Sequence, residues 1–257
     1  MEYYWDNFIF RSCNTDSIHE QFIDINHYYE DMLSKSIKTL EENLILRKQK
    51  EIFYNYVLID ANAFVCLLKD ISHKKEPSID DLVFFKSIII YVGKGCRLRK
   101  SSHLTDSYKI LTGSMENSEL PKRLKNILDI WGDGGGIMVL ELCSDSNHFI
   151  SMCRENAMIQ SAGSNLTNLI KGAAYGAMKN TWTKKEILLY GDMLLFFALK
   201  KCINDKPISI LPSDMISSEI SKLNIRTKYE LQGVLEYFLE IYIFIQKHVS
   251  FYDLPLF

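Results

Sequence analysis

The sequence lacks several features that would place it at once in a class of protein. Its six cysteines form no C-x-x-C pair, which argues against a zinc knuckle and a thioredoxin-type motif. Two apolar stretches, 187–203 and 231–245, carry acidic residues and are shorter than the ~20 residues of a membrane-spanning helix. The N-terminus has neither a basic start nor an apolar core, so we expect no secretory signal. We therefore predict an intracellular protein of the nucleus or cytoplasm, with free thiols and no membrane partner.

Positive charge is not in excess either. Lys and Arg number 30 against 32 Asp and Glu, which argues against a uniformly basic nucleic-acid-binding surface. The cations are nevertheless clustered, because five of them lie between Lys94 and Lys109 against a single acidic residue, Asp106. Three more follow at positions 122, 123 and 125. A local cluster of this kind can attract an anionic ligand whatever the total charge.

The hydrophobic pattern predicts an α+β fold. At 257 residues, 47% of them hydrophobic, the chain can form one core with helical additions. Runs of aromatic and branched aliphatic residues predict strands at 53–60, from Phe85 or Ser87 to Val92, and at 137–142. Helical spacing predicts helices at 97–111, 120–131, 147–162, 184–202 and 229–249. We predict a core over 53–214, an N-terminal helical extension over 1–52 and a C-terminal helical extension over 215–257.

The most informative segment is Tyr91-Val92-Gly93-Lys94-Gly95. We expect it to end an apolar strand with a phenol and a tight glycine turn. Arg97, Arg99 and His103 follow, at what should be the start of a helix. A phenol, an imidazole and several cations within thirteen residues suit a phosphodiester ligand. The segment does not have the spacing of a phosphate-binding G-x-x-x-x-G-K-[ST] loop.

Further strings occur in a fixed order along the chain. They are the segment above, Ile127 to Trp131 with the glycine loop after it, Arg154-Glu155-Asn156-Ala157, and Leu166-Thr167-Asn168 with Gly172. Together they resemble the GIY-YIG nucleases, specifically the nuclease domain of LEM-domain and ankyrin-repeat endonucleases, from about residue 54 to about 214. The chain lacks room for ankyrin repeats and a LEM fold beside such a domain.

The resemblance implies a fold and an activity. The fold is a small three-stranded antiparallel sheet flanked by helices, so 53–214 would be the nuclease domain. The activity is that of a metal-dependent DNA endonuclease that hydrolyses phosphodiester bonds, acts on branched or distorted DNA and uses Mg²⁺ or Mn²⁺. One carboxylate suffices for such a metal, because Mg²⁺ keeps several waters and takes one or two protein oxygens.

The resemblance also implies a role for each candidate residue. Tyr56 would help to deprotonate the attacking water, and Tyr91 would lie near the scissile phosphate. Arg99 and His103 would share a helical face and contact the phosphate. Glu155 would hold the metal, and Asn168 would position the loop beside it. The substrate-binding candidates are Lys94, Arg97 and Lys100.

Several alternatives remain open. The first motif reads Tyr54-Asn55-Tyr56, without a glycine, so Tyr54 is a second candidate for its phenol. Arg97 and Arg99 compete for one role. A phenol is a poor base unless nearby cations lower its pKa, and we expect Lys94, Arg97, Arg99 and Mg²⁺ to do so. Other possible functions are a catalytically weak nucleic-acid-binding or scaffold protein with the nuclease fold, and an RNA-directed enzyme.

Overall fold

The computed structural model describes residues 18–44, 52–74, 76–96, 99–115 and 119–215. The chain divides into two compact units, Met1–Pro212 and Ser213–Phe257. Nearly all of the second unit lies outside the described residues, and so does the helix predicted at 229–249. The proposed domain boundaries at 52 and 214 stay predictions.

The first unit is built on an antiparallel sheet with the strand order β2-β1-β3-β4. The strands are β1 Phe53–Asp60, β2 Ile89–Gly95, β3 Ile137–Ser146 and β4 Ser209–Ile210. The α+β class is confirmed, but the predicted three strands are joined by β4, which pairs with the start of β3. The sequence pattern missed β4 because two residues cannot display the alternation that marks a strand.

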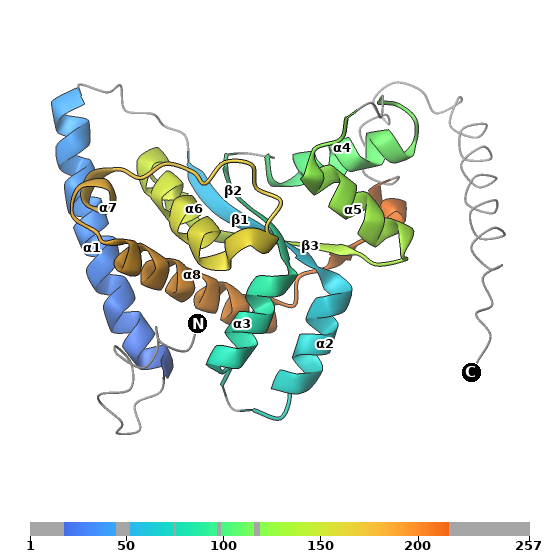
Figure 1. Cartoon of the computed structure of the whole chain (residues 1–257), viewed down its shortest axis with the longest axis horizontal. Coiled ribbons are helices and arrows are strands. Elements are labelled where there is room, and N and C mark those ends of the chain that lie inside the picture. Colours follow the sequence, from blue (N-terminus) through green and yellow to red (C-terminus); the bar gives the residue numbers. More distant parts are fainter. Residues whose placement is uncertain (1–17, 45–51, 75, 97–98, 116–118, 216–257) are drawn as a thin grey trace. The chain divides into compact units, whose positions relative to one another are not determined.

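Helices cover both faces of this sheet. They are α1 Ile18–Leu44, α2 Ala61–Ile71, α3 Ile79–Ile88, α4 Ser102–Leu111, α5 Lys122–Gly132, α6 His148–Ala162, α7 Gly176–Asn180 and α8 Lys184–Asp205. Short 3₁₀ turns lie at Arg99–Ser101 and Gly163–Asn165. Helices α6 and α8 pack on one side of the sheet, and α4 and α5 lie on the other (Figure 1).

The central strand β1 separates two apolar layers. Because successive side chains of a strand point to opposite faces, Val57 and Ile59 belong to the large core with α6 and α8. Tyr54, Tyr56 and Leu58 are equally buried but face the other way, toward α4 and α5. Two tyrosines in the middle of a buried strand are thus presented on one face.

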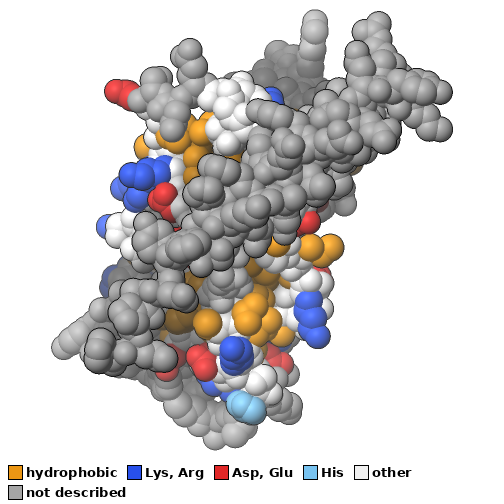
Figure 2. Space-filling model, turned by 90° about the vertical axis from the view of Figure 1, so that its right-hand side faces the viewer, with side chains coloured by type: hydrophobic (Ala, Val, Ile, Leu, Met, Phe, Trp, Pro, Cys, Tyr) orange, Lys and Arg blue, Asp and Glu red, His pale blue; other side chains and the backbone are white. Residues whose placement is uncertain are grey.

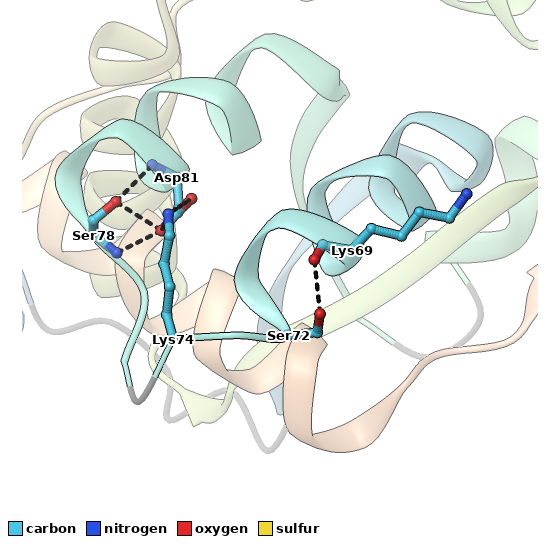
Figure 3. A network of polar contacts seen from close by, with 5 residues as sticks. All are labelled: Lys69, Ser72, Lys74, Ser78 and Asp81. Carbon is cyan, nitrogen blue, oxygen red and sulfur yellow. Dashed lines mark hydrogen bonds and ion pairs between the residues drawn. The ribbon is translucent and has the colours of Figure 1, made fainter.

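Helix α3 begins at a capping box (Figure 3). The Ser78 hydroxyl accepts from the Asp81 amide, and the Asp81 carboxylate accepts from the Ser78 amide and hydroxyl, each at 2.7 Å. The Lys74 amine donates to both carboxylate oxygens of Asp81, at 2.7 and 2.9 Å. Burial alone would raise the pKa of Asp81, but these hydrogen bonds lower it. Nearby, the Ser72 hydroxyl donates to the Lys69 carbonyl at the end of α2.

This cap changes the second strand from the one predicted. The expected strand from Phe85 or Ser87 begins instead at Ile89, because the capped helix α3 continues through Ile88. The predicted glycine turn is also wrong, since β2 extends through both of its glycines to Gly95 and pairs there with β1. The first two strands are paired with each other, antiparallel.

The helix predicted at 184–202 is α8, which also contains the apolar stretch 187–203. Met193, Leu195 and Phe196 of this helix are fully buried. Within the described ranges no helix combines the length and the apolar character that crossing a membrane requires.

The N-terminal helix α1 shares the core of the sheet rather than lying apart from it. Phe22, Leu33 and Ile37 on one of its faces are buried in that core. Tyr29, also buried, meets the Trp182 ring edge to face, with ring centroids 4.7 Å apart. Burial of this apolar face stabilises α1 against α8 and the loop before it.

A polar network joins α1 to α6 and α8 inside this layer. The Arg154 guanidinium donates two hydrogen bonds to the Glu30 carboxylate, at 2.9 and 2.7 Å. The Tyr190 hydroxyl donates to the same carboxylate at 2.5 Å. Burial and these contacts make Glu30 and Arg154 dependent on each other, because a lone charge there would have lost its water without a partner.

Glu30→Gln should therefore destabilise the fold. It leaves the Arg154 charge buried without its counter-ion, and we expect the free energy of unfolding to fall by about 3 kcal/mol or more. Urea denaturation measures it. The matched control is Asp31→Asn, whose partner Lys35 is exposed, as Asp31 is, and which should cost less than about 0.5 kcal/mol. Equal costs for both changes would contradict the role given to the buried pair.

Candidate active site

The face of the sheet toward α4 and α5 presents two phenols side by side. Tyr56 lies in the middle of β1 and is fully buried, and Tyr91 lies on β2 with its ring centroid 6.0 Å from that of Tyr56. Gly93 is directly opposite Tyr56 in the register. A β-carbon at Gly93 would come within 2.7 Å of both phenol side chains, so only glycine lets them pack this closely. The glycine of the motif thus makes room for the phenol pair.

His103 completes a cluster with the two phenols. It comes from the first turn of α4 and is buried. Its Nε2 atom lies 2.9 Å from the Tyr56 hydroxyl, and its ring meets the Tyr91 ring at a centroid distance of 4.7 Å. We call Tyr56, Tyr91 and His103 the phenol cluster.

A hydrogen bond from Arg123 of α5 determines which ring nitrogen of His103 carries the hydrogen. Its Nε donates to His103 Nδ1 at 3.2 Å, and its guanidinium lies 6.0 Å from the centre of the Tyr91 ring. Because arginine stays protonated, Nδ1 must act as an acceptor, and a neutral ring then carries its hydrogen on Nε2. We assign the Nε2–H as donor to the Tyr56 oxygen on this basis.

The imidazole of His103 is neutral at physiological pH. Burial, followed by the charges of Arg123 and Arg99, lowers the pKa of His103 to about 4. A neutral His103 donates to Tyr56, and Tyr56 in turn acts to lower the pKa of Tyr91. The donors of the cluster are therefore directed from Arg123 through His103 to the Tyr56 oxygen.

Burial is the largest influence on the pKa of each phenol. It raises the pKa of Tyr56, and Arg99 opposes it only in part. It also raises the pKa of Tyr91, although Arg123, Arg99 and the bond with Tyr56 act to lower it. The prediction that neighbouring cationic side chains lower the phenol pKa is therefore wrong for the side chains alone, because loss of water outweighs their charge.

Side chains of the loop after α6 form hydrogen bonds with the outward-facing backbone N–H and C=O groups of β2. Among the described strands, β2 lies at one end of the sheet. The Asn168 amide pairs with Val92 as a neighbouring strand would, accepting from its amide at 3.0 Å and donating to its carbonyl at 2.7 Å. The amide and hydroxyl of Thr167 both donate to the Ile90 carbonyl, at 2.9 and 2.8 Å.

Glu155 of α6 takes the next outward position on β2. Its Oε1 accepts from the Lys94 amide at 3.0 Å. Burial raises the pKa of Glu155, while this hydrogen bond and the charges of Lys94 and Arg99 act to lower it. A largely buried carboxylate beside Tyr91 is a hard oxygen ligand, and a divalent cation would restore its ionised form.

The donor set fits a magnesium-type ion. In the described part of the chain, no three His, Cys, Asp or Glu side chains gather as a complete metal cage. Mg²⁺ does not require one, since it binds through one or two carboxylates together with waters and substrate phosphates. Glu155 is the residue that would hold such an ion.

The predicted cationic residues have different surroundings. Arg99 is exposed in the 3₁₀ turn before α4, and its charge acts on both phenols, His103 and Glu155. Lys94 lies with its amine 3.1 Å from His148 Nδ1. Lys100 forms an ion pair with Glu141. Arg97 lies outside the described residues.

The described basic side chains do not form one continuous surface on the face seen in Figure 2. There Lys and Arg are interspersed with hydrophobic side chains. This agrees with the formal net charge of −2. Local cations such as Arg99 therefore matter more for an anionic ligand than a general basic field.

Two residues of the site were missed by the sequence reasoning. Glu141 of β3 lies directly opposite Tyr56 on the side away from Gly93, and it accepts from Lys100 and Ser144. The alternation of the third predicted strand was the signal that it shares a face with Tyr56. Arg123 was noted only as part of a basic cluster, and no sequence spacing links it to a histidine twenty positions earlier.

The structure thus brings most of the predicted residues to one region. The phenol cluster lies on the face of the sheet, and Glu155 and Asn168 lie at the outer edge of β2. Tyr54 is two residues before Tyr56 on the same face, and its hydroxyl accepts from the Lys100 amide at 3.3 Å. The catalytic roles of these residues remain proposals.

The small antiparallel sheet, with its paired phenols, a histidine and a partly buried glutamate at one edge, agrees with the expected GIY-YIG nuclease fold. Residues 53–217 match the family described as LEM-3-like GIY-YIG domain, and the chain belongs to that family. Its members are generally dependent on divalent metal, and their substrate is nucleic acid.

A curated relative supports the same membership. The chain is 27% identical over 165 residues to the ankyrin repeat and LEM domain-containing protein 1 of Mus musculus. The aligned segment is 63% of this chain and 30% of the relative, so the chain spans less than a third of that protein. No solved structure gives a significant match.

Arg123→Met should change the ionisation of His103. The variant removes both a cation and the donor to Nδ1, so the pKa of His103 should rise from about 4 toward 6.5 and its Nε2–H form should lose its preference. Side-chain ¹⁵N spectra of His103 across pH measure both. Lys122→Met is the control, because exposed Lys122 is the neighbouring cation on α5.

The same shift has a consequence for stability. Because the folded-state pKa lies below the ordinary value, the unfolded chain binds more protons between pH 6.5 and 4. The free energy of unfolding should therefore fall as the pH drops through this range, and less so in Arg123→Met. A doubly protonated His103 at pH 7 would contradict the assignment.

Proposed function

We propose that the domain is a divalent-metal-dependent DNA endonuclease that hydrolyses phosphodiester bonds, with branched or distorted DNA as its substrate. The observation that carries the proposal is the phenol cluster on β1, β2 and α4, with Glu155 bonded to the same strand β2. Family membership supports the nuclease class. The substrate structure, the metal and the catalytic roles are the proposed parts.

The arrangement separates the tasks of hydrolysis among the side chains. A metal held by Glu155 would stabilise the charge that gathers on the phosphate oxygens. Exposed Arg99 adds a second positive charge, since it already acts on Tyr56, Tyr91 and Glu155. These charges are needed at the phosphate because the transition state differs most from the substrate there.

Once one phenol of the pair is ionised in the loaded site, its phenolate can accept the proton of the attacking water. Tyr56 acts to lower the pKa of Tyr91, and the Tyr56 oxygen is 2.9 Å from His103 Nε2. Tyr56 thus helps deprotonation by stabilising negative charge that the pair takes up. Neutral His103 acts as a donor in this chain, and Arg123 keeps it in that form.

The buried environment limits when the pair can act. Both phenols have raised pKa values, so neither is ionised at neutral pH through the side chains alone. Binding of cations and substrate beside Tyr91 would change that balance. The pair would therefore act as a base only in the loaded site.

Glu155→Gln should abolish metal-dependent cleavage while DNA binding is largely kept, because the ion serves the chemistry more than the docking. The amide can still accept from Lys94, so the fold should survive. The assay uses labelled linear duplex, single-stranded, flap and four-way-junction DNA, and an RNA strand, with Mg²⁺, Mn²⁺ or EDTA. Asp70→Asn, an exposed acid on α2, is the matched control.

The outcomes separate the possible functions. Cutting that requires metal and is lost in Glu155→Gln would support the proposal and rank the substrates. Unchanged cutting in that variant would remove Glu155 from the mechanism. Binding without cutting by the wild type would favour a scaffold protein, and cutting of RNA alone would favour an RNA-directed enzyme.

Tyr56→Phe and Tyr54→Phe should differ sharply. Loss of the Tyr56 hydroxyl removes the group between His103 and Tyr91, and we expect kcat to fall at least about 100-fold. Loss of the Tyr54 hydroxyl removes an acceptor of the Lys100 amide and should change kcat only about threefold. Single-turnover cleavage measures both, and urea midpoints report the folding of each. A larger loss of kcat in Tyr54→Phe than in Tyr56→Phe would mean that Tyr54 supplies the phenol of the first motif.

A further inference from the structure

The loop that follows Asn168 is anchored on both sides of a four-residue turn. At its start, Asn168 makes two hydrogen bonds with Val92 of β2, at 3.0 and 2.7 Å. At its end, the Lys171 carbonyl accepts from the Asn156 amide of α6 at 3.0 Å. Both anchors are side-chain amides that replace backbone partners, so the loop is fixed without being part of a strand or helix.

Gly172 brings the end of the loop against α6. Its φ angle is +75°, and a β-carbon there would lie 3.2 Å from the α-carbon of Asn156. A side chain at this position would be strained by its backbone and pressed against the helix. The conformation of the turn is therefore set by its ends rather than by its own middle residues.

The middle of the turn presents two aliphatic side chains to solvent. Leu169 and Ile170 are each 78% exposed. Exposed aliphatic neighbours gain nothing from folding and commonly mark a contact site. Since the anchors hold the turn in place, this pair, called here the 169–170 tip, is held outward in a defined position.

The tip lies next to the candidate active site. Its first anchor, Asn168, bonds to Val92, which immediately follows Tyr91 of the phenol cluster. Its second anchor, Asn156, immediately follows Glu155. A ligand whose phosphate reached Glu155 and Tyr91 would therefore extend along the edge of β2 toward the tip.

A cation adjoins the tip. Lys171 follows Ile170 directly and is exposed like it. A nucleic acid offers both of the chemistries that this turn matches, phosphates for the lysine and base faces for the aliphatic pair.

We propose that Leu169 and Ile170 form a wedge that packs against unstacked bases beside the cleaved phosphate. The proposal rests on the proposed function and gives it a physical basis for selecting branched or distorted DNA. Aliphatic side chains that enter a base step must overcome stacking, which costs a few kcal/mol in a regular duplex and least where the stack is already broken. A wedge at this place therefore favours binding of DNA whose bases are already unstacked at the cleavage point.

The test compares the double variant Leu169→Ser with Ile170→Ser against the wild type. We expect kcat/KM on a flap and on a four-way junction to fall about tenfold, since base packing is lost. The affinity for linear duplex in EDTA should be unchanged. Ile208→Ser is the matched control, because Ile208 is 82% exposed and precedes β4 at the opposite end of the sheet.

A second readout reports the wedge without cleavage. A 2-aminopurine base at the branch point should brighten when the wild-type protein binds in EDTA, because it becomes unstacked. The signal should be lost in the double variant and kept in Ile208→Ser. Urea midpoints of the variants should match the wild type, as both side chains are exposed.

The results distinguish this inference from the proposed function. Cleavage and fluorescence that are unchanged in the double variant would overturn the wedge and leave the endonuclease proposal standing. An equal loss of affinity for linear duplex would overturn it too, because the tip would then be a general contact. If the wild type cuts no DNA, the endonuclease proposal fails, and the fluorescence alone decides for or against the wedge.

Discussion

The outward backbone groups of β2 need hydrogen-bond partners, because this strand lies at one end of the described sheet and its N–H and C=O groups would otherwise face water or another chain. Three side chains meet that need in succession. Thr167 donates to the Ile90 carbonyl, and Asn168 bonds to both the amide and the carbonyl of Val92. Glu155 accepts from the Lys94 amide. Two of the side chains that cover this edge, Asn168 and Glu155, are therefore also residues of the candidate site.

One face of β2 and its outer edge contribute different parts of the candidate site. One face packs the phenol pair against His103, which Arg123 keeps neutral and oriented. The edge holds the carboxylate. Because Tyr56 is buried, and Tyr91 and Glu155 are partly so, the site resists ionisation at each of these positions, and an added cation would favour the ionised form of all three. A site of this kind couples its chemistry to occupation by metal and phosphate.

Local pattern predicted the elements well and the site only in part. Strand β1 has the predicted bounds, because its aromatic and branched residues are buried on both faces. The start of strand β2 was misplaced because a four-residue capping box at Ser78 begins a helix that continues into an apolar run, and this run is equally typical of a strand. Motif order placed Tyr56 and Glu155 near each other, whereas the link from Arg123 to His103 depends on how α4 and α5 pack, which spacing does not encode. The phenol pKa was misjudged because charges are visible in a sequence and loss of water is not.

Three consecutive residues of α6 connect the site to the rest of the unit. Arg154 binds Glu30 of α1, Glu155 binds the backbone of β2, and Asn156 binds the loop that carries the 169–170 tip. Successive residues of a helix point about 100° apart, so one turn reaches three different elements. Helix α1 lies outside the family match at 53–217, yet it is tied by a partly buried ion pair to the residue next to the proposed metal ligand. The position of Glu155 therefore depends on a segment that the family match alone would leave out, because a shift of α1 would be passed to α6 through Arg154.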